Sequence, residues 1–343
     1  MRRLLNTLYV TAQGAYLTKD GEAVAVRVEH ETRLRVPLHG LGGVVCFGQV
    51  SASPALLGAC AEADVGVSFL SENGRFLASV RGPVSGNVLL RREQYRRADS
   101  APGRAGLARC FVQGKLLNCR AVVRRALRDH GAGMDAAPLE AVARGFTDMA
   151  ERAARAATDD SVRGIEGEAA AAYFGVFGQL VRVDDPAFGF TTRSRRPPLD
   201  AVNCLLSFLY TLLAHDVRSA LEAVGLDPQV GFLHRDRPGR PSLALDVMEE
   251  FRPWLADRLV LSLINRKQVR PGDFTRGGTG GVLLTDEARK RVLVAWQARK
   301  QEEVTHPFID EKVAVGLLPH VQALLLARHL RGELDGYPPF LWR

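Results

Sequence analysis

The chain has 343 residues, of which 46% are hydrophobic and 24% are charged. This length suggests about two domains with sizeable cores, so disorder, collagen and coiled coil are excluded as the main state. The 46 Lys and Arg residues exceed the 38 Asp and Glu residues by eight, and the whole excess lies in residues 91–130, which contain eleven basic and three acidic residues.

The first 85 residues contain short β-prone runs. Asp20-Gly21 predicts a hairpin turn, and Ser53 followed by Pro54 predicts the start of a single helix. We predict a small, mostly antiparallel β domain over residues 1–85, a β-sandwich or β-roll with one helix. The expected strands are 8–10, 15–18, 23–28, 33–38, 44–48, 65–70 and 75–80.

From residue 88 onward the hydrophobic period becomes helical, so we predict a larger all-α catalytic domain over residues 86–343 and an α+β fold for the chain. The expected helices are 88–98, 101–128, 138–157, 161–183, 198–224, 241–265, 286–303 and 310–332. The loop at 269–281 is too glycine-rich to hold one conformation unaided. It lacks the Gly-Lys-Ser/Thr ending of a P-loop, which argues against a nucleotide-using enzyme.

The sequence indicates neither a membrane-spanning nor a secreted protein. No run of about 18 uncharged apolar residues and no signal-peptide pattern occurs, so we expect a soluble, intracellular protein with no membrane partner. The five cysteines include no C-x-x-C pair, which argues against a disulfide framework and a zinc site. We expect reduced, mostly buried thiols.

Glu166 is the first candidate for chemistry. On a helix it shares a face with Val162, Ala170 and Tyr173, so its carboxylate emerges on a largely apolar, inward face. A buried carboxylate needs a partner, either an arginine of another helix or a bound cation. Glu168 faces small residues and is the reserve choice.

Three further carboxylates follow a predicted helix start at Pro241. Asp246, Glu249 and Glu250 have the spacing i, i+3 and i+4, which predicts that they share one face and repel one another unless a divalent cation binds. His234 lies just before this helix. Imidazole and carboxylate ligands suit Mn²⁺ or Mg²⁺. The alternative is a solvated acidic face that pairs with neighbouring arginines.

Arginine dominates the basic segment 91–130 and also occurs in the later loops. Because guanidinium groups bind phosphate oxygens in a bidentate manner, this pattern indicates contacts to a DNA or RNA backbone. The alternative is an ordinary solvated helix surface.

Four segments, in order and spacing, resemble the CRISPR-associated Cas1 family, the integrases and endonucleases of spacer acquisition. The segments are Gly164-Ile165-Glu166-Gly167 with Tyr173-Phe174, Arg196-Pro197-Pro198-Leu199-Asp200-Ala201-Val202-Asn203, Gly231-Phe232-Leu233-His234, and Leu243 to Pro253. The resemblance covers essentially the whole chain. Its length and its ending, Tyr337 to Arg343, are most similar to subtype I-C.

The resemblance implies a metal site of Glu166, His234 and Glu249, with Asp246 as an accessory acidic residue and Mg²⁺ or Mn²⁺ as cofactor. It also implies a homodimer formed through the β domains, two of which flank a Cas2 dimer in a four-to-two complex. That assembly would hold double-stranded prespacer DNA and insert its 3′-hydroxyl ends into the CRISPR repeat. The subtype resemblance adds a Cas4 nuclease as a partner, and the expected location is the prokaryotic cytoplasm.

The candidate DNA contacts fall into two groups. The first group would steady the phosphate near the metal: Arg235, Arg237, Arg240 and Arg252. The second group would hold the duplex farther away: Arg91, Arg92, Arg96, Arg97, Arg193, Arg195 and Arg196. Tyr9 or Tyr16 is a candidate to stack on the prespacer's duplex end.

Two other functions remain open on sequence grounds. The first is a metal-dependent DNA nuclease that acts alone, since hydrolysis would use the same metal site with water as nucleophile. The second is a non-catalytic DNA-binding scaffold whose charged side chains merely pair with one another.

Overall fold

The computed structural model describes residues 6–63, 65–72, 74, 76–80, 82, 88–278 and 280–342. The domain boundary expected between residues 85 and 86 lies outside them. The chain forms two compact units, the first of residues 1–86, 284–304 and 313–317, and the second of residues 87–283, 305–312 and 318–343. Among the described helices, none is both long and apolar enough to cross a membrane.

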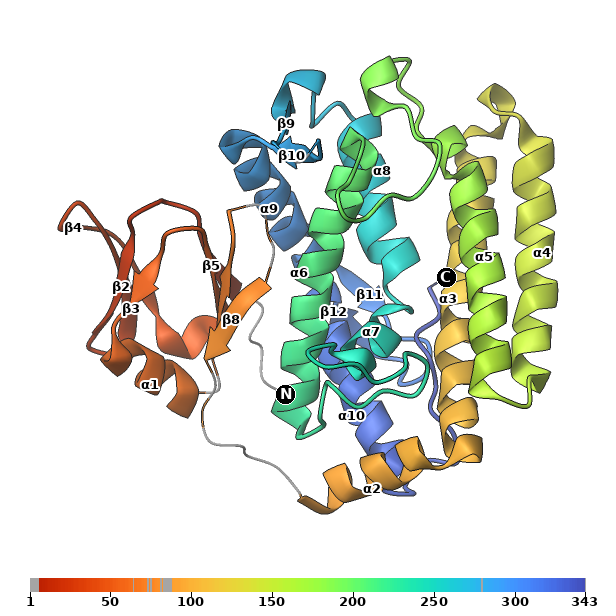
Figure 1. The fold of residues 1–343 in the computed structure, drawn as a ribbon, viewed down its shortest axis with the longest axis horizontal. Helices are drawn as coiled ribbons and strands as arrows, with labels where there is room; N and C mark the ends of the chain where they lie inside the picture. The colour runs from red at the N-terminus through yellow and green to blue at the C-terminus, as the bar shows by residue number, and fades with distance from the viewer. Residues whose placement is uncertain are drawn as a thin grey trace. The chain divides into compact units, whose positions relative to one another are not determined.

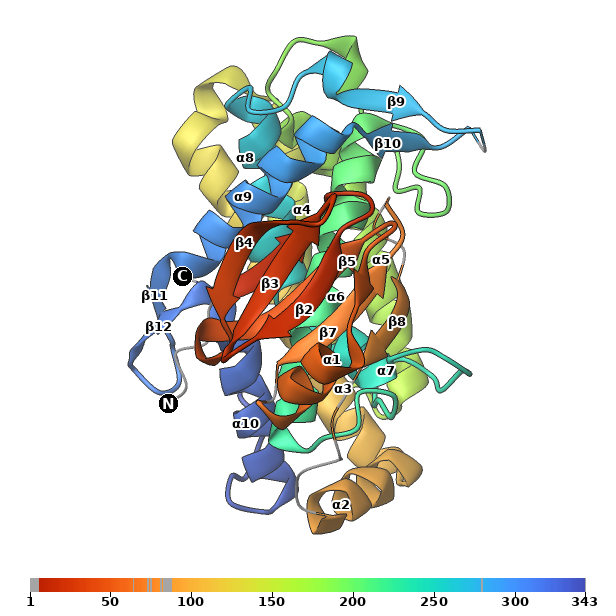
Figure 2. The same cartoon turned by 90° about the vertical axis from the view of Figure 1, so that its left-hand side faces the viewer.

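The described strands of residues 6–80 form two four-stranded sheets. One sheet has the order β1 (Asn6–Val10), β5 (Leu41–Phe47), β7 (Gly66–Leu70) and β8 (Phe76–Val80). The other has the order β4 (Glu31–Pro37), β3 (Ala23–Val28), β2 (Tyr16–Asp20) and β6 (Ser51–Ala52). Figure 2 shows β3 lying between β2 and β4 in this second sheet.

The expectation of a mostly antiparallel domain is wrong. Strand β5 pairs in parallel with both β1 and β7, and β6 pairs in parallel with β2. Parallel neighbours need a crossover. Helix α1 (Pro54–Glu62) and strand β6 lie on the path from β5 to β7, and strands β2, β3 and β4 lie on the path from β1 to β5.

The turn and the helix predicted for this unit are both present, and local sequence signals account for them. Gly21 has a φ of 59° beside the pair Asp20↔Ala23, which closes the β2–β3 hairpin. The Ser53 side chain accepts a hydrogen bond from the backbone N–H of Leu56 at 3.2 Å, which caps α1. The core contains side chains from both sheets and from α1, including Leu17, Val44 and Leu56.

Helix α9 (Asp286–Gln301) also belongs to the first unit, although it comes late in the chain. The Gln297 side chain donates to the backbone oxygen of Thr7 on β1 at 2.8 Å. Strands β11 (Glu303–Thr305) and β12 (Lys312–Ala314) form a hairpin after α9.

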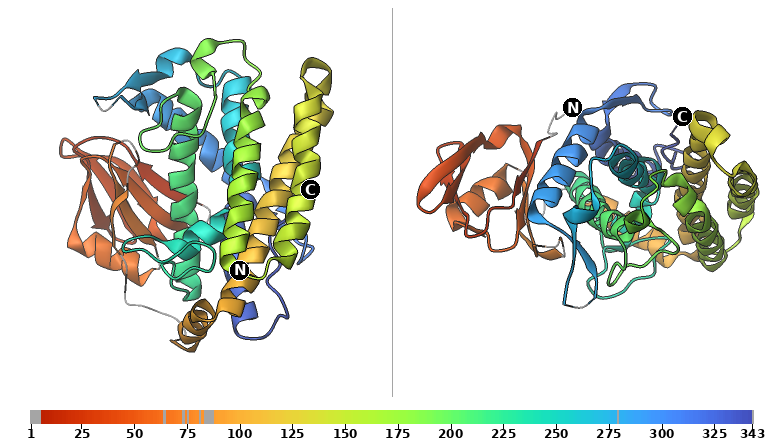
Figure 3. Two further views of the ribbon diagram at one scale, coloured as in Figure 1. Left: turned by 45° about the vertical axis from the view of Figure 1, so that its right-hand side comes forward. Right: turned by 90° about the horizontal axis from the view of Figure 1, so that it is seen from above.

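The second unit is mostly helical, which confirms the α+β class. Its helices are α2 (Val88–Asp99), α3 (Ala101–His130), α4 (Ala136–Arg155), α5 (Asp159–Leu180), α6 (Ala201–Val224), α7 (Ser242–Met248), α8 (Arg258–Asn265) and α10 (Leu318–Leu330). Helices α3, α4 and α5 lie side by side (Figures 1 and 3). Phe111, Phe146 and Phe177 of these helices are fully buried.

The helix expected over 241–265 is interrupted. Helix α7 ends at Met248, a turn follows, and a π-helical segment, η4 (Arg252–Asp257), leads into α8. Pro253 explains the break, because it has no N–H to donate to the carbonyl of Glu249. Such π-helical turns occur often at functional sites.

Two short hairpins interrupt the helical pattern where none was expected. The glycine-rich loop contains β9 (Phe274–Arg276) and β10 (Val282–Leu284), joined by the hydrogen bond from Gly277 N to Gly281 O at 2.8 Å. The helix expected from residue 310 begins only at Leu318, because residues 312–314 form β12.

Candidate metal centre

Two acidic side chains from separate elements meet at one lysine inside the second unit. The Nζ atom of Lys115, from the middle of α3, forms an ion pair with Glu166 Oε1 of α5. The same atom lies 2.8 Å from Glu249 Oε2, in the turn that follows α7. Lys115 is 7% exposed, and a lysine so buried is almost always paired.

Glu249 is the most enclosed member of this cluster, with 1% exposure. Its Oε1 atom lies 2.8 Å from Arg252 Nη1 and 3.9 Å from His234 Nε2. Burial alone would raise the pKa of Glu249, but Arg252, Lys115 and His234 together lower it to about 2. Glu249 is therefore an anion at neutral pH.

His234 is oriented by a fully buried aspartate. Its Nδ1 atom lies 2.7 Å from Oδ1 of Asp246, which leaves Nε2 on the side of Glu249. The two Asp246 oxygens also accept the backbone N–H groups of Phe232, Leu233 and His234 at 2.6 to 3.0 Å. A carboxylate behind the second ring nitrogen is the usual support of a metal-binding histidine.

The local geometry leaves no room for a side chain at Gly231. A Cβ atom there would lie 2.8 Å from Asp246 Oδ2 and from the backbone of Ser242. Glycine at this position lets the His234 loop approach Asp246 closely.

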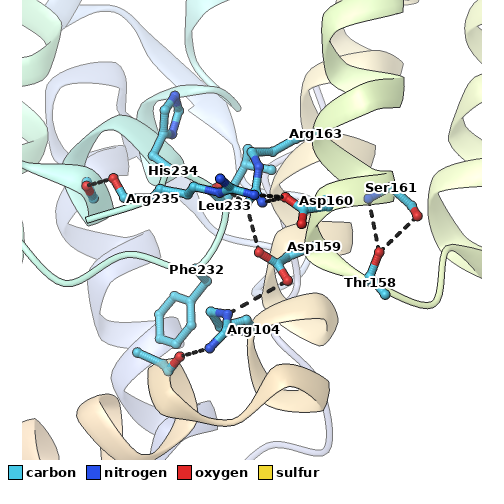
Figure 4. Close-up of polar contacts among 12 residues, drawn as sticks. Arg104, Thr158, Asp159, Asp160, Ser161, Arg163, Phe232, Leu233, His234 and Arg235 are labelled. Carbon is cyan, nitrogen blue, oxygen red and sulfur yellow. Dashed lines mark hydrogen bonds and ion pairs between the residues drawn. The ribbon is translucent and has the colours of Figure 1, made fainter. Parts of the chain in front are cut away.

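Residues at the start of α5 form a second group of contacts with the loop that carries His234 (Figure 4). Arg163 Nη1 donates to the backbone oxygen of Leu233 at 2.9 Å and to Asp159 Oδ2 at 2.7 Å. Arg235 Nη2 donates to Asp160 Oδ1 at 2.6 Å. Helix α5 therefore supplies Glu166 and also fixes the loop that carries His234.

The three carboxylates expected on one helical face point in different directions. Asp246 faces the His234 loop, and Glu249 faces Lys115 and Arg252. Glu250 turns toward the C-terminal segment, where it accepts from Tyr337 Oη at 2.6 Å and from Phe340 N at 2.7 Å. The expectation of a shared face is wrong because the helix ends at Met248.

Burial raises the pKa of Glu250 to about 8, against the lowering effect of its hydrogen bonds to Tyr337, Phe340 and Gln322. The hydrogen bonds of Glu250 connect the C-terminal segment to the turn that contains Glu249. The carboxyl group of Glu250 does not face Lys115.

The arginines predicted to contact DNA differ in their burial and in their partners. Arg252 lies in the cluster, with its guanidinium 5.0 Å from the Tyr210 ring centre. Arg193 is held by Asn203 Oδ1 at 2.8 Å and Ser207 Oγ at 3.0 Å. The exposed arginines are Arg92, Arg96, Arg195, Arg196, Arg235 and Arg237, and the half-buried ones are Arg91, Arg97 and Arg240.

The reserve candidate Glu168 has its partner outside this cluster, and the two stacking candidates belong to the first unit. Glu168 forms a bidentate pair with Arg152, with both distances 2.9 Å. Tyr16 on β2 is exposed, whereas Tyr9 on β1 is half-buried and packs 6.4 Å from Phe47 between ring centres.

The donor chemistry of the cluster fits a Mg²⁺ or Mn²⁺ ion. Two carboxylates converge on one cation, and an imidazole nitrogen with a supporting carboxylate lies beside them. Within the described part of the chain, however, no three His, Cys, Asp or Glu side chains already lie close enough together to hold a metal. The ammonium of Lys115 holds the two carboxylates instead.

Comparison with known proteins assigns the chain to a family. The family model described as CRISPR associated protein Cas1 matches residues 8–298. The chain belongs to the Cas1 family. The predicted membership is therefore confirmed.

A CRISPR-associated endonuclease Cas1 of Chlorobaculum tepidum is 58% identical over 343 residues, with full coverage of both chains. Its name agrees with the prediction of an endonuclease. A Cas1 protein structure from Thermotoga maritima aligns with a TM-score of 0.82 at 24% identity, over 95% of this chain and 97% of that one. A casposase bound to its integration product aligns with a TM-score of 0.84 at 22% identity, over 98% and 94%. Both structural matches support the fold.

Two residues of the cluster's surroundings were not selected from the sequence. Lys115 counted only as one member of the basic segment, although Phe111 and Cys119, one turn to either side, are apolar and indicate an inward face. Arg163 precedes Glu166 by three residues, so it lies on nearly the same helical face. Nothing in the sequence connects it to Leu233.

Proposed function

We propose that this protein is the integrase of CRISPR spacer acquisition, which joins the 3′-hydroxyl ends of prespacer DNA to the CRISPR repeat. The observation that carries the proposal is a cluster in which buried Glu249 pairs with Arg252 and lies 3.9 Å from His234, while Lys115 joins Glu249 to Glu166. A solvated acidic face would not bury Glu249 with two cationic partners.

The residues have distinct tasks in this proposal. Glu166, Glu249 and His234 would hold Mg²⁺ or Mn²⁺, which would polarise a phosphodiester of the repeat and lower the pKa of the attacking 3′-hydroxyl. Asp246 keeps the His234 ring in place. Arg252 lies near enough to Glu249 to bind a phosphate oxygen at the same point. One phosphodiester replaces another, so no covalent enzyme intermediate and no ATP are required.

The exposed arginines suit a second task, the binding of the DNA backbone away from the metal. Arg195 and Arg196 project from a loop of the catalytic unit, and Arg92 and Arg96 project from α2. Arg235 and Arg237 follow His234 in the chain and would steady the phosphate near the metal instead. Such contacts would position double-stranded DNA without reading its sequence.

The family resemblance supports the remaining parts of the proposal. The β domain of residues 1–85 would form the homodimer, and two dimers would flank a Cas2 dimer in a four-to-two complex. The sequence Tyr337 to Arg343 supports subtype I-C, with a Cas4 nuclease as a further partner. The assembly would act in the cytoplasm of a prokaryote.

The test is a strand-transfer reaction with Cas2, a fluorescent prespacer, Mn²⁺ and a supercoiled plasmid that carries a CRISPR repeat. We expect label joined to the plasmid by the wild type and none with Glu166→Gln or His234→Ala. Glu168→Gln is the matched control on α5, and it should keep the activity. Nicked plasmid without joined label would favour a nuclease acting alone, and DNA binding without metal-dependent chemistry would favour a scaffold.

A further inference from the structure

Lys115 lies at the centre of the cluster, and the joining reaction described above gives it no task. Its ammonium contacts carboxylates from two separate elements, Glu166 of α5 and Glu249 of the turn after α7. Lys115 and Glu249 are both buried, so their ion pair is shielded from solvent, whereas the Glu166 side chain is 25% exposed. Burial strengthens the attraction within an ion pair relative to that of a surface lysine, and desolvation offsets part of this gain.

The four charged side chains at this point are balanced in the structure. Glu166 and Glu249 are the acidic groups, and Lys115 and Arg252 are the cationic ones. A divalent ion on the same two carboxylates would lie next to the ammonium of Lys115. Two neighbouring cations in a buried site repel strongly, so Lys115 and a divalent ion cannot both bind Glu166 and Glu249 at the same time.

We propose that Lys115 is the resident counter-ion of the metal centre, which bridges Glu166 and Glu249 without metal and leaves both carboxylates when Mg²⁺ or Mn²⁺ binds. This inference rests on the metal-dependent function proposed above. It explains why the acidic groups stay together in the folded protein, although they would repel each other alone.

The same exchange connects metal binding to DNA binding. Once a divalent ion replaces the ammonium at the carboxylates, the positive charges of Lys115 and Arg252 are no longer balanced by Glu166 and Glu249. A phosphodiester of DNA is an anion that would restore the balance. The ion pair of Lys115 therefore disfavours metal binding until DNA is present.

Mn²⁺ titration calorimetry on the full-length protein, without DNA, tests the exchange. Lys115→Met removes the competitor, and we expect its Mn²⁺ affinity to rise about tenfold or more. Lys115→Arg keeps the charge and should stay near the wild-type affinity. Lys300→Met is the control for loss of a buried lysine elsewhere, since Lys300 is 5% exposed on α9, and its affinity should not change. Equal or weaker Mn²⁺ binding by Lys115→Met would overturn the proposal.

A second measurement follows Lys115 itself in the wild type, and a variant serves only to assign its resonance. In protein labelled with ¹³C at the lysine side chains, the Lys115 resonance is assigned by its loss in Lys115→Arg and followed during Mg²⁺ titration. We expect it to shift with the same dissociation constant as Mg²⁺ binding. An unmoved Lys115 resonance at saturating Mg²⁺ would overturn the exchange.

The two proposals fail in different ways. Mn²⁺ binding that survives both Glu166→Gln and Glu249→Gln would contradict the proposed metal centre, and therefore also the proposed role of Lys115. Mn²⁺ binding that is lost in those variants, together with an unmoved Lys115 resonance, would overturn the role of Lys115 alone.

Discussion

His234 Nδ1 and Asp246 Oδ1 lie 2.7 Å apart, and this contact determines which ring nitrogen of His234 faces Glu249. Asp246 is fully buried and also accepts three backbone N–H groups of the same loop. A single carboxylate therefore shapes the loop and orients the imidazole. Its contribution to a metal centre is to position His234.

Asp246→Asn should damage the centre without removing a proposed metal ligand. The amide nitrogen would face backbone N–H donors, so at least one hydrogen bond is lost and the His234 ring loses its support. We expect Mn²⁺ affinity to fall by about tenfold to a hundredfold, as for other residues that support a metal-bound histidine. Titration calorimetry measures the affinity. Asp236→Asn, on the exposed part of the same loop, is the control, and equal affinities for the two variants would contradict the positioning role.

Arg163 should support the same loop from the opposite side. Its contacts with Leu233 O and Asp159 would be lost in Arg163→Met, so the His234 loop should loosen while α5 remains folded. We expect kcat for strand transfer to fall by about tenfold or more, with DNA affinity less affected. The control is Arg155→Met, because Arg155 is exposed at the end of α4 and pairs with Glu151. Loss of DNA affinity with normal kcat would instead indicate that Arg163 binds DNA.

The hydrogen-bond network at the C-terminus should contribute to stability. Tyr337→Phe removes a donor to Glu250 in a fully buried network that also includes Gln322. We expect the free energy of unfolding to fall by about 1 to 3 kcal/mol, measured by urea denaturation. Tyr95→Phe removes a comparable hydrogen bond to Asp227 at an exposed position and should cost less. Equal losses would show that burial of the network has no special weight.

Asp257 should make stability depend on pH. Burial raises its pKa to about 7, against the lowering effects of Tyr210, Arg252 and Arg193. In the window between its ordinary value and about 7, the folded protein keeps a proton that the unfolded chain loses, so the contribution of Asp257 to stability falls as pH rises.

Asp257→Asn retains an acceptor for the Tyr210 hydroxyl, which lies 2.7 Å from Oδ1, and removes the titration. We expect a flatter plot of unfolding free energy against pH between pH 5 and 8 for this variant. The exposed Glu140→Gln serves as control. A slope identical to that of the wild type would show that Asp257 does not titrate in this range.

Local sequence signals predicted much of the fold. The Asp20-Gly21 turn, the capped start of α1 and the long helices α3 to α6 follow from residues near one another in the chain. The parallel pairing of β5 depends on crossovers through other elements, which no short pattern records. In the sequence, the break after Met248 is indicated only by Pro253 inside an otherwise helical pattern.

The candidate site shows the same division. Glu166, His234 and Glu249 were selected from their spacing and from the family resemblance. Lys115 joins Glu166 to Glu249, and Glu249 in turn lies beside His234. Lys115 is the single lysine among the arginines of segment 91–130, and it is buried. Its partners lie 51 and 134 positions away in the chain, too far for helical periodicity to indicate.

The most direct measurement of the central claim is a crystal structure of the protein soaked with Mn²⁺, with anomalous diffraction data to locate the ion. We predict one strong anomalous peak in contact with Glu166, Glu249 and Nε2 of His234, with the ammonium of Lys115 moved away from both carboxylates. A peak elsewhere, or none at these residues at saturating Mn²⁺, would contradict the metal centre on which the proposed integrase depends.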